Sequence, residues 1–219
     1  MRFLPALGLA ALLAAPAVSA QATFGVKAGV QAANVSLDDV PDGNGIDKKA
    51  RLGIVAGLTA DLPLSPSIAV RPELLYTQKG YQVTSEGNGL AGSATARIDY
   101  LEVPLMLAYN VVQPSGLAFS IEAGPTLAYK LSSGIGCDFE GAVGEAFCDA
   151  QEIGDAEGDD GIKDFDFGGA LGATVGSGPF GVGIRYTQGF IDIGKNAGEA
   201  DGARNSTFAA TLHYKFGAY

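Results

Sequence analysis

Large apolar residues recur at every second position along most of the chain after residue 22. The residues between them are small, polar or charged, and this period of two is the pattern of a β-strand with two different faces. No comparable stretch has helical periodicity. The pattern predicts eight strands, within 23–34, 51–62, 67–83, 99–110, 117–131, 164–176, 180–190 and 206–216.

The connections between these stretches alternate in length. Three are short turns, at 63–67, 112–116 and 176–179. Four are long and polar, at 34–50, 83–97, 132–163 and 191–204. In an antiparallel meander this places all short turns at one end and all long loops at the other, which is typical of an outer-membrane barrel. We therefore expect an all-β fold, an eight-stranded antiparallel up-and-down transmembrane β-barrel.

The volume of the lumen decides which face points inward. An eight-stranded barrel has an interior just wide enough for side chains. About forty large apolar side chains would not fit there, whereas the glycines, alanines, serines and threonines of the other face would. We expect the apolar face to point outward, with a soluble lipocalin-like barrel as the alternative.

Ten aromatic residues of the apolar face support this orientation. They fall into two groups, one at each end of the strands, as membrane-interface girdles require. The groups are Phe24, Tyr109, Phe119, Phe180 and Tyr214 near the short turns, and Tyr76, Tyr129, Phe165, Phe190 and Phe208 near the long loops.

Three prolines stand inside consecutive predicted strands, Pro72, Pro104 and Pro125. Proline has no N–H for the strand ladder, and a closed barrel has no free edge to accommodate it. We expect a local bulge at each, with a slip of one residue in parity.

The N-terminus resembles a secretory signal peptide. Arg2 precedes an apolar run that is too short to span a bilayer, and small residues precede a cleavage site between Ala20 and Gln21. We expect residues 1–20 to be removed and residues 21–219 to form one barrel domain. The formal charge of −10 argues against a nucleic-acid partner.

Several motifs are similar to a known family, notably "RPELLYTQKGY" and "IDYLEVPLMLAY". With "FGVKAGVQAANVS", "IEAGPTLAYKLS" and "GVGIRYTQGFIDI", they resemble the PorT-type outer-membrane β-barrel domain, often described as the porin family. The resemblance covers essentially the whole predicted mature chain. It implies an eight-stranded barrel in the outer membrane of Gram-negative bacteria, and its namesake implies a link to the secretion of surface proteins. Members usually end on an aromatic residue in phase with the last strand, whereas Tyr219 is out of phase with Phe216.

Charged residues of both signs fall on the predicted inner face. Isolated charges in a narrow lumen would be costly, so we expect them to form ion pairs that plug the barrel. An ion path or gate is the alternative. The predicted network consists of Lys27, Arg71, Glu73, Glu102, Glu122 and Arg185.

The two cysteines, Cys137 and Cys148, are predicted to form a disulfide, because an exported chain is oxidised. They lie in an acidic loop where "DAEGDDGIKDFD" resembles a Ca²⁺ loop, but the glycine is one position late and no helices flank it. A solvated acidic surface is the simpler interpretation. We expect no metal site.

Catalytic chemistry is not indicated. The single histidine, His213, is predicted to face the lumen without a nucleophile beside it. We expect no enzymatic activity and no cofactor. The expected partners are outer-membrane lipids, the barrel-assembly machinery and a surface ligand or secretion partner. The predicted function is envelope structure, adhesion or surface contact from the outer membrane, with the long loops outside the cell. A narrow channel for small solutes or ions and a secretion-accessory barrel are the alternatives.

Overall fold

The computed structural model describes residues 22–37, 46–87, 90–114, 116–139, 162–194 and 203–217. They form eight β-strands, as the alternation predicts. The strands are β1 (Thr23–Leu37), β2 (Ile46–Pro63), β3 (Ile68–Gly87), β4 (Leu90–Val112), β5 (Leu117–Phe139), β6 (Phe165–Ser177), β7 (Phe180–Gly189) and β8 (Ala203–Lys215). No helix in the described residues is long and apolar enough to span a membrane.

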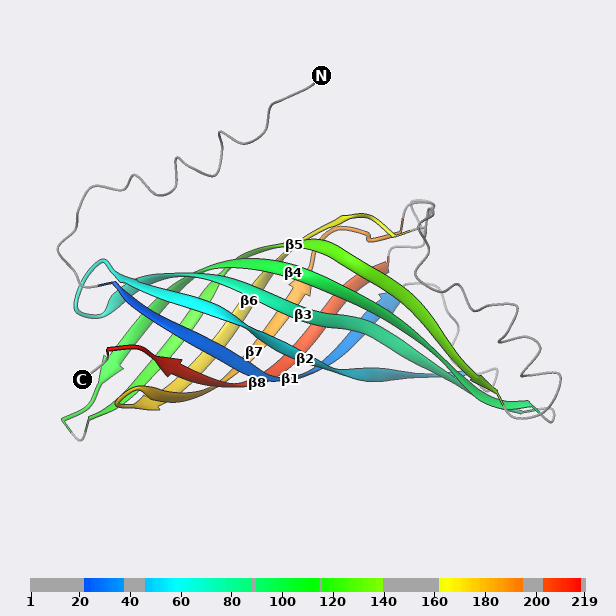
Figure 1. Cartoon of the computed structure of the whole chain (residues 1–219), viewed down its shortest axis with the longest axis horizontal. Coiled ribbons are helices and arrows are strands. Elements are labelled where there is room, and N and C mark those ends of the chain that lie inside the picture. The colour runs from blue at the N-terminus through cyan, green and yellow to red at the C-terminus, as the bar shows by residue number, and fades with distance from the viewer. Residues whose placement is uncertain are drawn as a thin grey trace, which may run out of the picture.

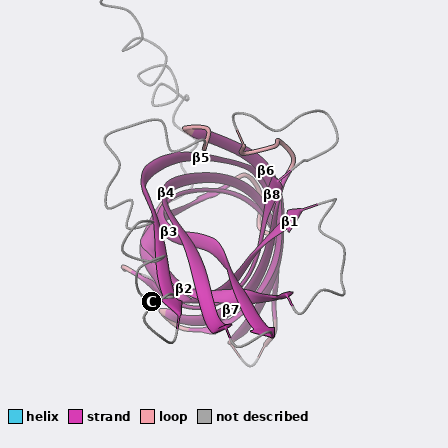
Figure 2. Cartoon of the chain, turned by 90° about the vertical axis from the view of Figure 1, so that its right-hand side faces the viewer, coloured by secondary structure: helices cyan, strands magenta, loops and turns pink. Residues whose placement is uncertain are grey.

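The strands close into an antiparallel barrel in which each strand pairs with its neighbours in sequence. β8 returns to β1, and Val26 lies opposite Tyr214. Figure 2 looks along the barrel and shows the ring of strands around its interior. Closure gives every strand a hydrogen-bonding neighbour on both sides, which is what allows a β-structure to span lipid. The predicted eight-stranded up-and-down barrel is confirmed.

The inward and outward faces are those that the alternation predicts. Glu73 on β3 points into the lumen and is 3% exposed. Leu58 lies on the outer face of β2, opposite Leu74 of β3, and is 58% exposed. The aromatic residues also lie where expected. The rings of Tyr129 and Phe165 stand 5.2 Å apart near one end, and those of Phe180 and Tyr214 stand 5.2 Å apart near the other.

The expectation of bulges at the prolines is wrong. Each proline lies in a gap of the ladder that leaves the register unchanged. Pro72 lies between the Thr59–Glu73 and Leu62–Val70 pairs of β2 with β3. Pro104 lies between the Pro72–Leu105 and Leu75–Glu102 pairs of β3 with β4, and Pro125 lies between the Pro104–Thr126 and Leu107–Ala123 pairs of β4 with β5. Each proline therefore omits rungs of the ladder without adding a residue, because the neighbouring rungs on both sides hold the register.

The register shifts lie elsewhere, between Ala50 and Val55 of β2 and between Asp99 and Tyr100 of β4. At the first shift β2 no longer pairs with residues 78–80 of β3. Side-chain donors form hydrogen bonds to the backbone carbonyl groups of β3 there. The Gln31 side-chain amide donates to the Gln78 carbonyl oxygen at 2.9 Å, and the Arg51 guanidinium donates to the Lys79 carbonyl oxygen at 3.2 Å.

The strands are longer than predicted at the long-loop end. The predicted loop 83–97 is wrong, because β3 and β4 pair throughout it, with Val83 opposite Ala94. β5 continues to Phe139 and pairs with β4 as far as Gly92. Backbone hydrogen bonds hold these extensions, so they need no strong apolar alternation. Figure 1 shows β3, β4 and β5 reaching well past the shorter strands at this end.

Candidate functional site

The lumen contains a chain of ion pairs centred on Glu73. Lys27 Nζ lies 2.6 Å from Glu73 Oε1. Arg185 makes two bonds to the same carboxylate, from Nη1 to Oε2 at 2.6 Å and from Nη2 to Oε1 at 2.9 Å. Arg185 also bonds Glu122 on β5. These contacts cross the lumen between strands that are not neighbours in the sheet.

The ion pairs continue toward the short-turn end. Glu122 bonds Arg71, which in turn bonds Asp61 on β2. Asp61 also lies 2.6 Å from Lys215 Nζ at the end of β8. We call this set the first cluster: Lys27, Asp61, Arg71, Glu73, Glu122, Arg185 and Lys215. In the described residues it holds four cations against three anions, drawn from six of the eight strands.

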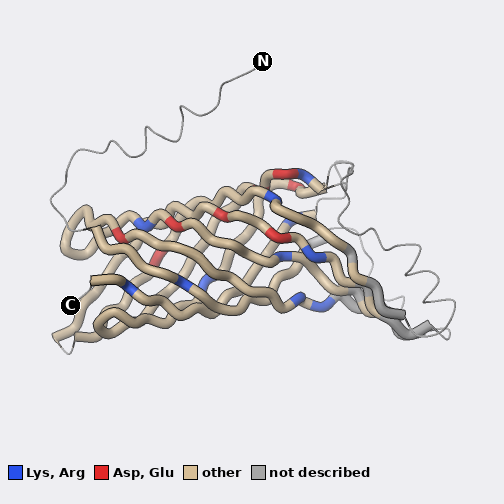
Figure 3. Tube along the Cα trace, viewed as in Figure 1, with Lys and Arg blue, Asp and Glu red and all other residues tan. Residues whose placement is uncertain are grey.

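A second cluster lies nearer the long-loop end. Lys79 Nζ lies 2.7 Å from Glu102 Oε2 and 3.7 Å from Asp166 Oδ2. The Asn205 side-chain amide donates to Asp166 Oδ2 at 2.9 Å. Lys79, Glu102, Asp166 and Asn205 are all buried. Figure 3 shows basic and acidic positions distributed along the barrel wall.

Apolar side chains also fill the lumen, which the small, polar inner face did not predict. Val55, Leu75 and Ala209 form one buried group. A second group lies toward the long-loop end: Val35, Ile98, Tyr100, Ala128 and Ile193. We call this second group the apolar cap.

Little space is left between these layers. A cavity of about 20 Å³ is bordered by Lys27, Thr77, Glu102, Arg185 and His213, among others. A volume of about 15 Å³ or more accommodates one water molecule. The described lumen is therefore filled by side chains at this level.

The ion pairs explain how charges persist in such an interior. Removing one partner of a buried pair leaves an uncompensated charge, which is far more costly than the loss of a surface pair. Glycine helps to position the carboxylates, since a Cβ on Gly172 would stand 3.1 Å from Glu122 Oε1. The arrangement is suited to holding the strands together across the lumen.

The structure brings together five of the six residues of the predicted network: Lys27, Arg71, Glu73, Glu122 and Arg185. Glu102 was expected with them but pairs with Lys79 instead, because it lies further toward the long-loop end. The predicted network also omitted Asp61 and Lys79. Their inward position in the alternation was the signal that could have found them.

The other predicted site residues are His213, the two cysteines and the residues of the signal-peptide cleavage site. His213 is buried, with Nε2 2.7 Å from Thr211 Oγ1. The described residues contain no group of three or more His, Cys, Asp or Glu side chains that could hold a metal ion. The signal peptide with Ala20 and Gln21, Cys148 and most of the acidic loop lie outside the described residues, and the side chain of Cys137 is not described. The disulfide thus stays a prediction.

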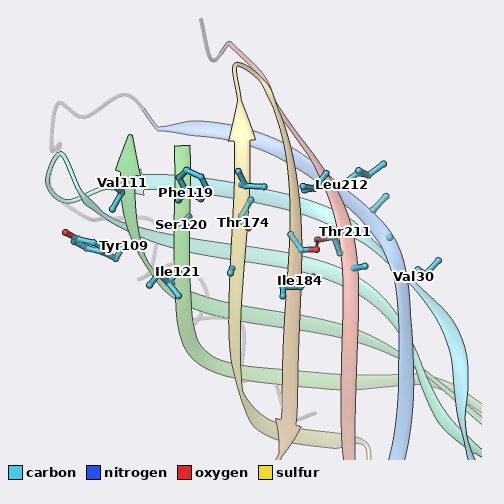
Figure 4. A pocket seen from close by; sticks show the side chains of 17 residues that line it. Val30, Tyr109, Val111, Phe119, Ser120, Ile121, Thr174, Ile184, Thr211 and Leu212 are labelled. Atoms are coloured by element: carbon cyan, nitrogen blue, oxygen red, sulfur yellow. Dashed lines mark hydrogen bonds between the residues drawn. The ribbon is translucent and has the colours of Figure 1, made fainter. Parts of the chain in front are cut away.

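The described residues also form a hollow that outward side chains border. It has a volume of about 940 Å³ and is bordered by outward side chains such as Val30, Ile121, Ile184 and Leu212. Figure 4 shows Val30 on β1, Ile121 on β5, Ile184 on β7 and Leu212 on β8, with the inner-face residues Thr174 and Thr211 beside them. Thr174 and Thr211 also border the small cavity in the lumen.

Several solved structures are similar to this chain. Ail of Yersinia pestis, crystallised with the heparin analogue sucrose octasulfate, shares 12% identity over 90% of this chain and 99% of its own, with a TM-score of 0.41. Neisserial surface protein A shares 13% over 90% and 99%, with a TM-score of 0.45. OprG of Pseudomonas aeruginosa shares 16% over 89% and 95%, with a TM-score of 0.43. At these identities the likeness concerns the fold and carries no activity with it.

No curated protein matches the chain. A family model described as "Outer membrane protein beta-barrel domain" matches residues 18–194, well over half of the 219 residues. This match agrees with the closed barrel, its apolar outer face and its aromatic girdles. The chain is thus a small eight-stranded barrel of the outer membrane, and it belongs to the outer-membrane protein β-barrel domain family.

Proposed function

We propose that this protein is a non-enzymatic outer-membrane barrel that acts through its surface and does not conduct solutes freely. The filled lumen carries this proposal. The first cluster crosses the interior from six strands, and the buried apolar cap lies on its long-loop side.

The long-loop end is the proposed contact surface outside the cell. β3, β4 and β5 extend past the shorter strands there. The acidic loop follows β5 in the sequence. Adhesion, envelope assembly or binding of a surface ligand would use this end, while lipids surround the barrel and the barrel-assembly machinery inserts it.

Electrical recordings test the filled lumen. The purified protein is reconstituted into planar bilayers, and we expect no large steady conductance. A narrow channel for small solutes or ions is the competing function, and a large steady conductance of the wild-type protein would establish it in place of ours.

Surface labelling tests the orientation. Cysteines introduced at Lys49 and at Ser65 report the two ends, since both positions are exposed. We expect an impermeant thiol reagent on intact cells to label the first and spare the second. The reverse pattern would place the short turns outside.

The PorT-type resemblance adds a finer proposal, an accessory role in the secretion of surface proteins. Deletion of the gene should then reduce the amount of secreted surface protein while leaving other barrels in place. Unchanged secretion would leave the surface-contact role and remove the accessory one.

A further inference from the structure

The second cluster contains two carboxylates, Glu102 and Asp166, and one cation, Lys79. Lys79 is close to Glu102, at 2.7 Å, and further from Asp166, at 3.7 Å. Among the described residues, no cation other than Lys79 lies within ion-pair distance of these two carboxylates. Both carboxylates are 3% exposed. A second buried carboxylate without its own cation would be costly if it were ionised.

Apart from Glu102 Oε2, which lies 2.7 Å from Lys79 Nζ, two oxygen atoms of the cluster have no hydrogen-bond partner. Asn205 Nδ2 donates to one oxygen of Asp166, Oδ2, at 2.9 Å. The other oxygens of both side chains, Asp166 Oδ1 and Asn205 Oδ1, are buried and have no hydrogen-bond partner. Both are acceptors, so a hydrogen atom is what this pair of side chains is missing.

Among the described residues, the surrounding strands supply no further cation within ion-pair distance of Asp166. β5 places Ala128 opposite it, and β7 brings Gly189 so close that a Cβ there would stand 3.0 Å from Asp166 Oδ1. From β4, the Tyr100 hydroxyl lies 3.4 Å from Asn205 Nδ2.

Two basic residues on other strands toward this end, Arg51 and Lys130, bond other groups. Arg51 of β2 donates to the Lys79 carbonyl oxygen and is partly exposed. Lys130 of β5 lies 3.4 Å from Asp164 and donates to the Ile162 carbonyl oxygen at 2.9 Å. A metal ion is not supported, because no group of three or more candidate ligands exists in the described residues.

We propose that the second cluster is a proton-binding site, in which Asp166 is neutral and holds one proton on Oδ1. This proton supplies the donor that Asp166 Oδ1 and Asn205 Oδ1 lack. It leaves Glu102 as the ionised partner of Lys79, so the cluster is electrically balanced beneath the apolar cap.

A small cavity lies between the two clusters. It has a volume of about 20 Å³ and borders Glu102 of the second cluster and Arg185 of the first, but not Asp166. Its volume accommodates one water molecule. The proton on Asp166 comes from bulk water as the protein folds, so no other reactant is needed.

Infrared spectroscopy of the folded protein at pH 7 tests the proposal directly. A protonated carboxyl group has a C=O stretching band that a carboxylate lacks. We expect this band in the wild type, its loss in Asp166→Asn, and its retention in Asp164→Asn, a matched change at an exposed carboxylate two residues away. Asn205→Leu should shift the band, because the carboxyl group loses its amide partner. Absence of the band in the wild type, or a band unaffected by Asp166→Asn, would overturn the proposal.

Stability measurements provide a second readout with two isosteric changes. Asp166→Asn replaces a neutral group by a neutral group, so its urea midpoint at pH 7 should stay near that of the wild type. Glu102→Gln removes the ionised partner of Lys79 and should lower the midpoint clearly. Equal losses for both variants would show that Asp166 is ionised and contradict the proposal. Neither result depends on whether the barrel conducts solutes.

Discussion

Arg185 and Glu73 are 112 positions apart in the chain and meet in the lumen through two parallel hydrogen bonds, of 2.6 and 2.9 Å. β7 and β3 are not neighbours in the sheet, so this pair spans the interior of the barrel. A two-point pair fixes the orientation of both side chains as well as their charge. It thereby connects opposite walls of a barrel whose neighbouring strands are held by backbone bonds.

Loss of this pair should destabilise the barrel strongly. Arg185→Met leaves Glu73 and Glu122 with fewer cations, and breaking a buried pair costs about 3–5 kcal/mol. Arg97→Met is the matched control, because Arg97 pairs with Asp99 but its side chain is 53% exposed, and such a pair contributes about 0–1 kcal/mol. Urea unfolding in lipid vesicles measures both. Equal effects of the two changes would contradict a structural role for the lumen pair.

A charged residue on the outer face should lower the folding stability of the barrel where that face meets lipid. Leu171 on β6 and Leu64 in a short turn are both 59% exposed, so a soluble protein would tolerate arginine equally at both. In a membrane, Leu171→Arg should cost about 2–4 kcal/mol near the midplane, and Leu64→Arg about 0–1 kcal/mol near the boundary. Folding yield into vesicles and urea midpoints measure the difference. Similar values for the two variants would argue against the membrane orientation.

Gly172 should be intolerant of even a methyl group. A Cβ there would stand 2.9 Å from the Ile184 carbonyl oxygen and 3.1 Å from Glu122 Oε1, within the first cluster. We expect Gly172→Ala to cost about 1–3 kcal/mol, as overpacking does in other interiors. Gly134→Ala is the control, since no heavy atom lies within 4 Å of a Cβ at that position. The temperature at which the folded band disappears in heat-modifiable gel electrophoresis compares them.

Glu102 should affect stability more than conductance. Glu102→Leu removes the 2.7 Å partner of Lys79 and leaves it with the more distant Asp166, and breaking a buried pair costs about 3–5 kcal/mol. The first cluster still crosses the lumen, so planar bilayers should show no large pore. A large steady conductance in this variant alone would mean that the second cluster is what closes the barrel.

The sequence predicted the facing of residues well because side-chain direction in a strand depends on neighbours in the chain. Lys27 between Val26 and Ala28 must face opposite to both, whichever strands lie beside it. The same local rule placed Arg71 and Glu73 inside with Leu74 outside. The rule also places Asp61 and Lys79 on the inner face, although the predicted network left them out.

Strand ends and irregularities were predicted poorly for a related reason. The stretch 83–97 lacks strong apolar alternation and was assigned to a loop, yet β3 and β4 pair through it by backbone bonds. Pro72 and Pro104 suggested bulges, but the register on either side is continuous. Pairing with neighbouring strands decides both features, and a single segment does not reveal it.

The sequence by itself determined the eight strands, their two faces and the closed barrel, because a period of two and the volume of the lumen are properties of the chain alone. The tertiary structure decided which charges meet. The relative heights of opposite strands bring Arg185 to Glu73 and Lys79 to Glu102, and they bring Asn205 to Asp166. Those heights follow from the register of the whole barrel, to which every strand contributes.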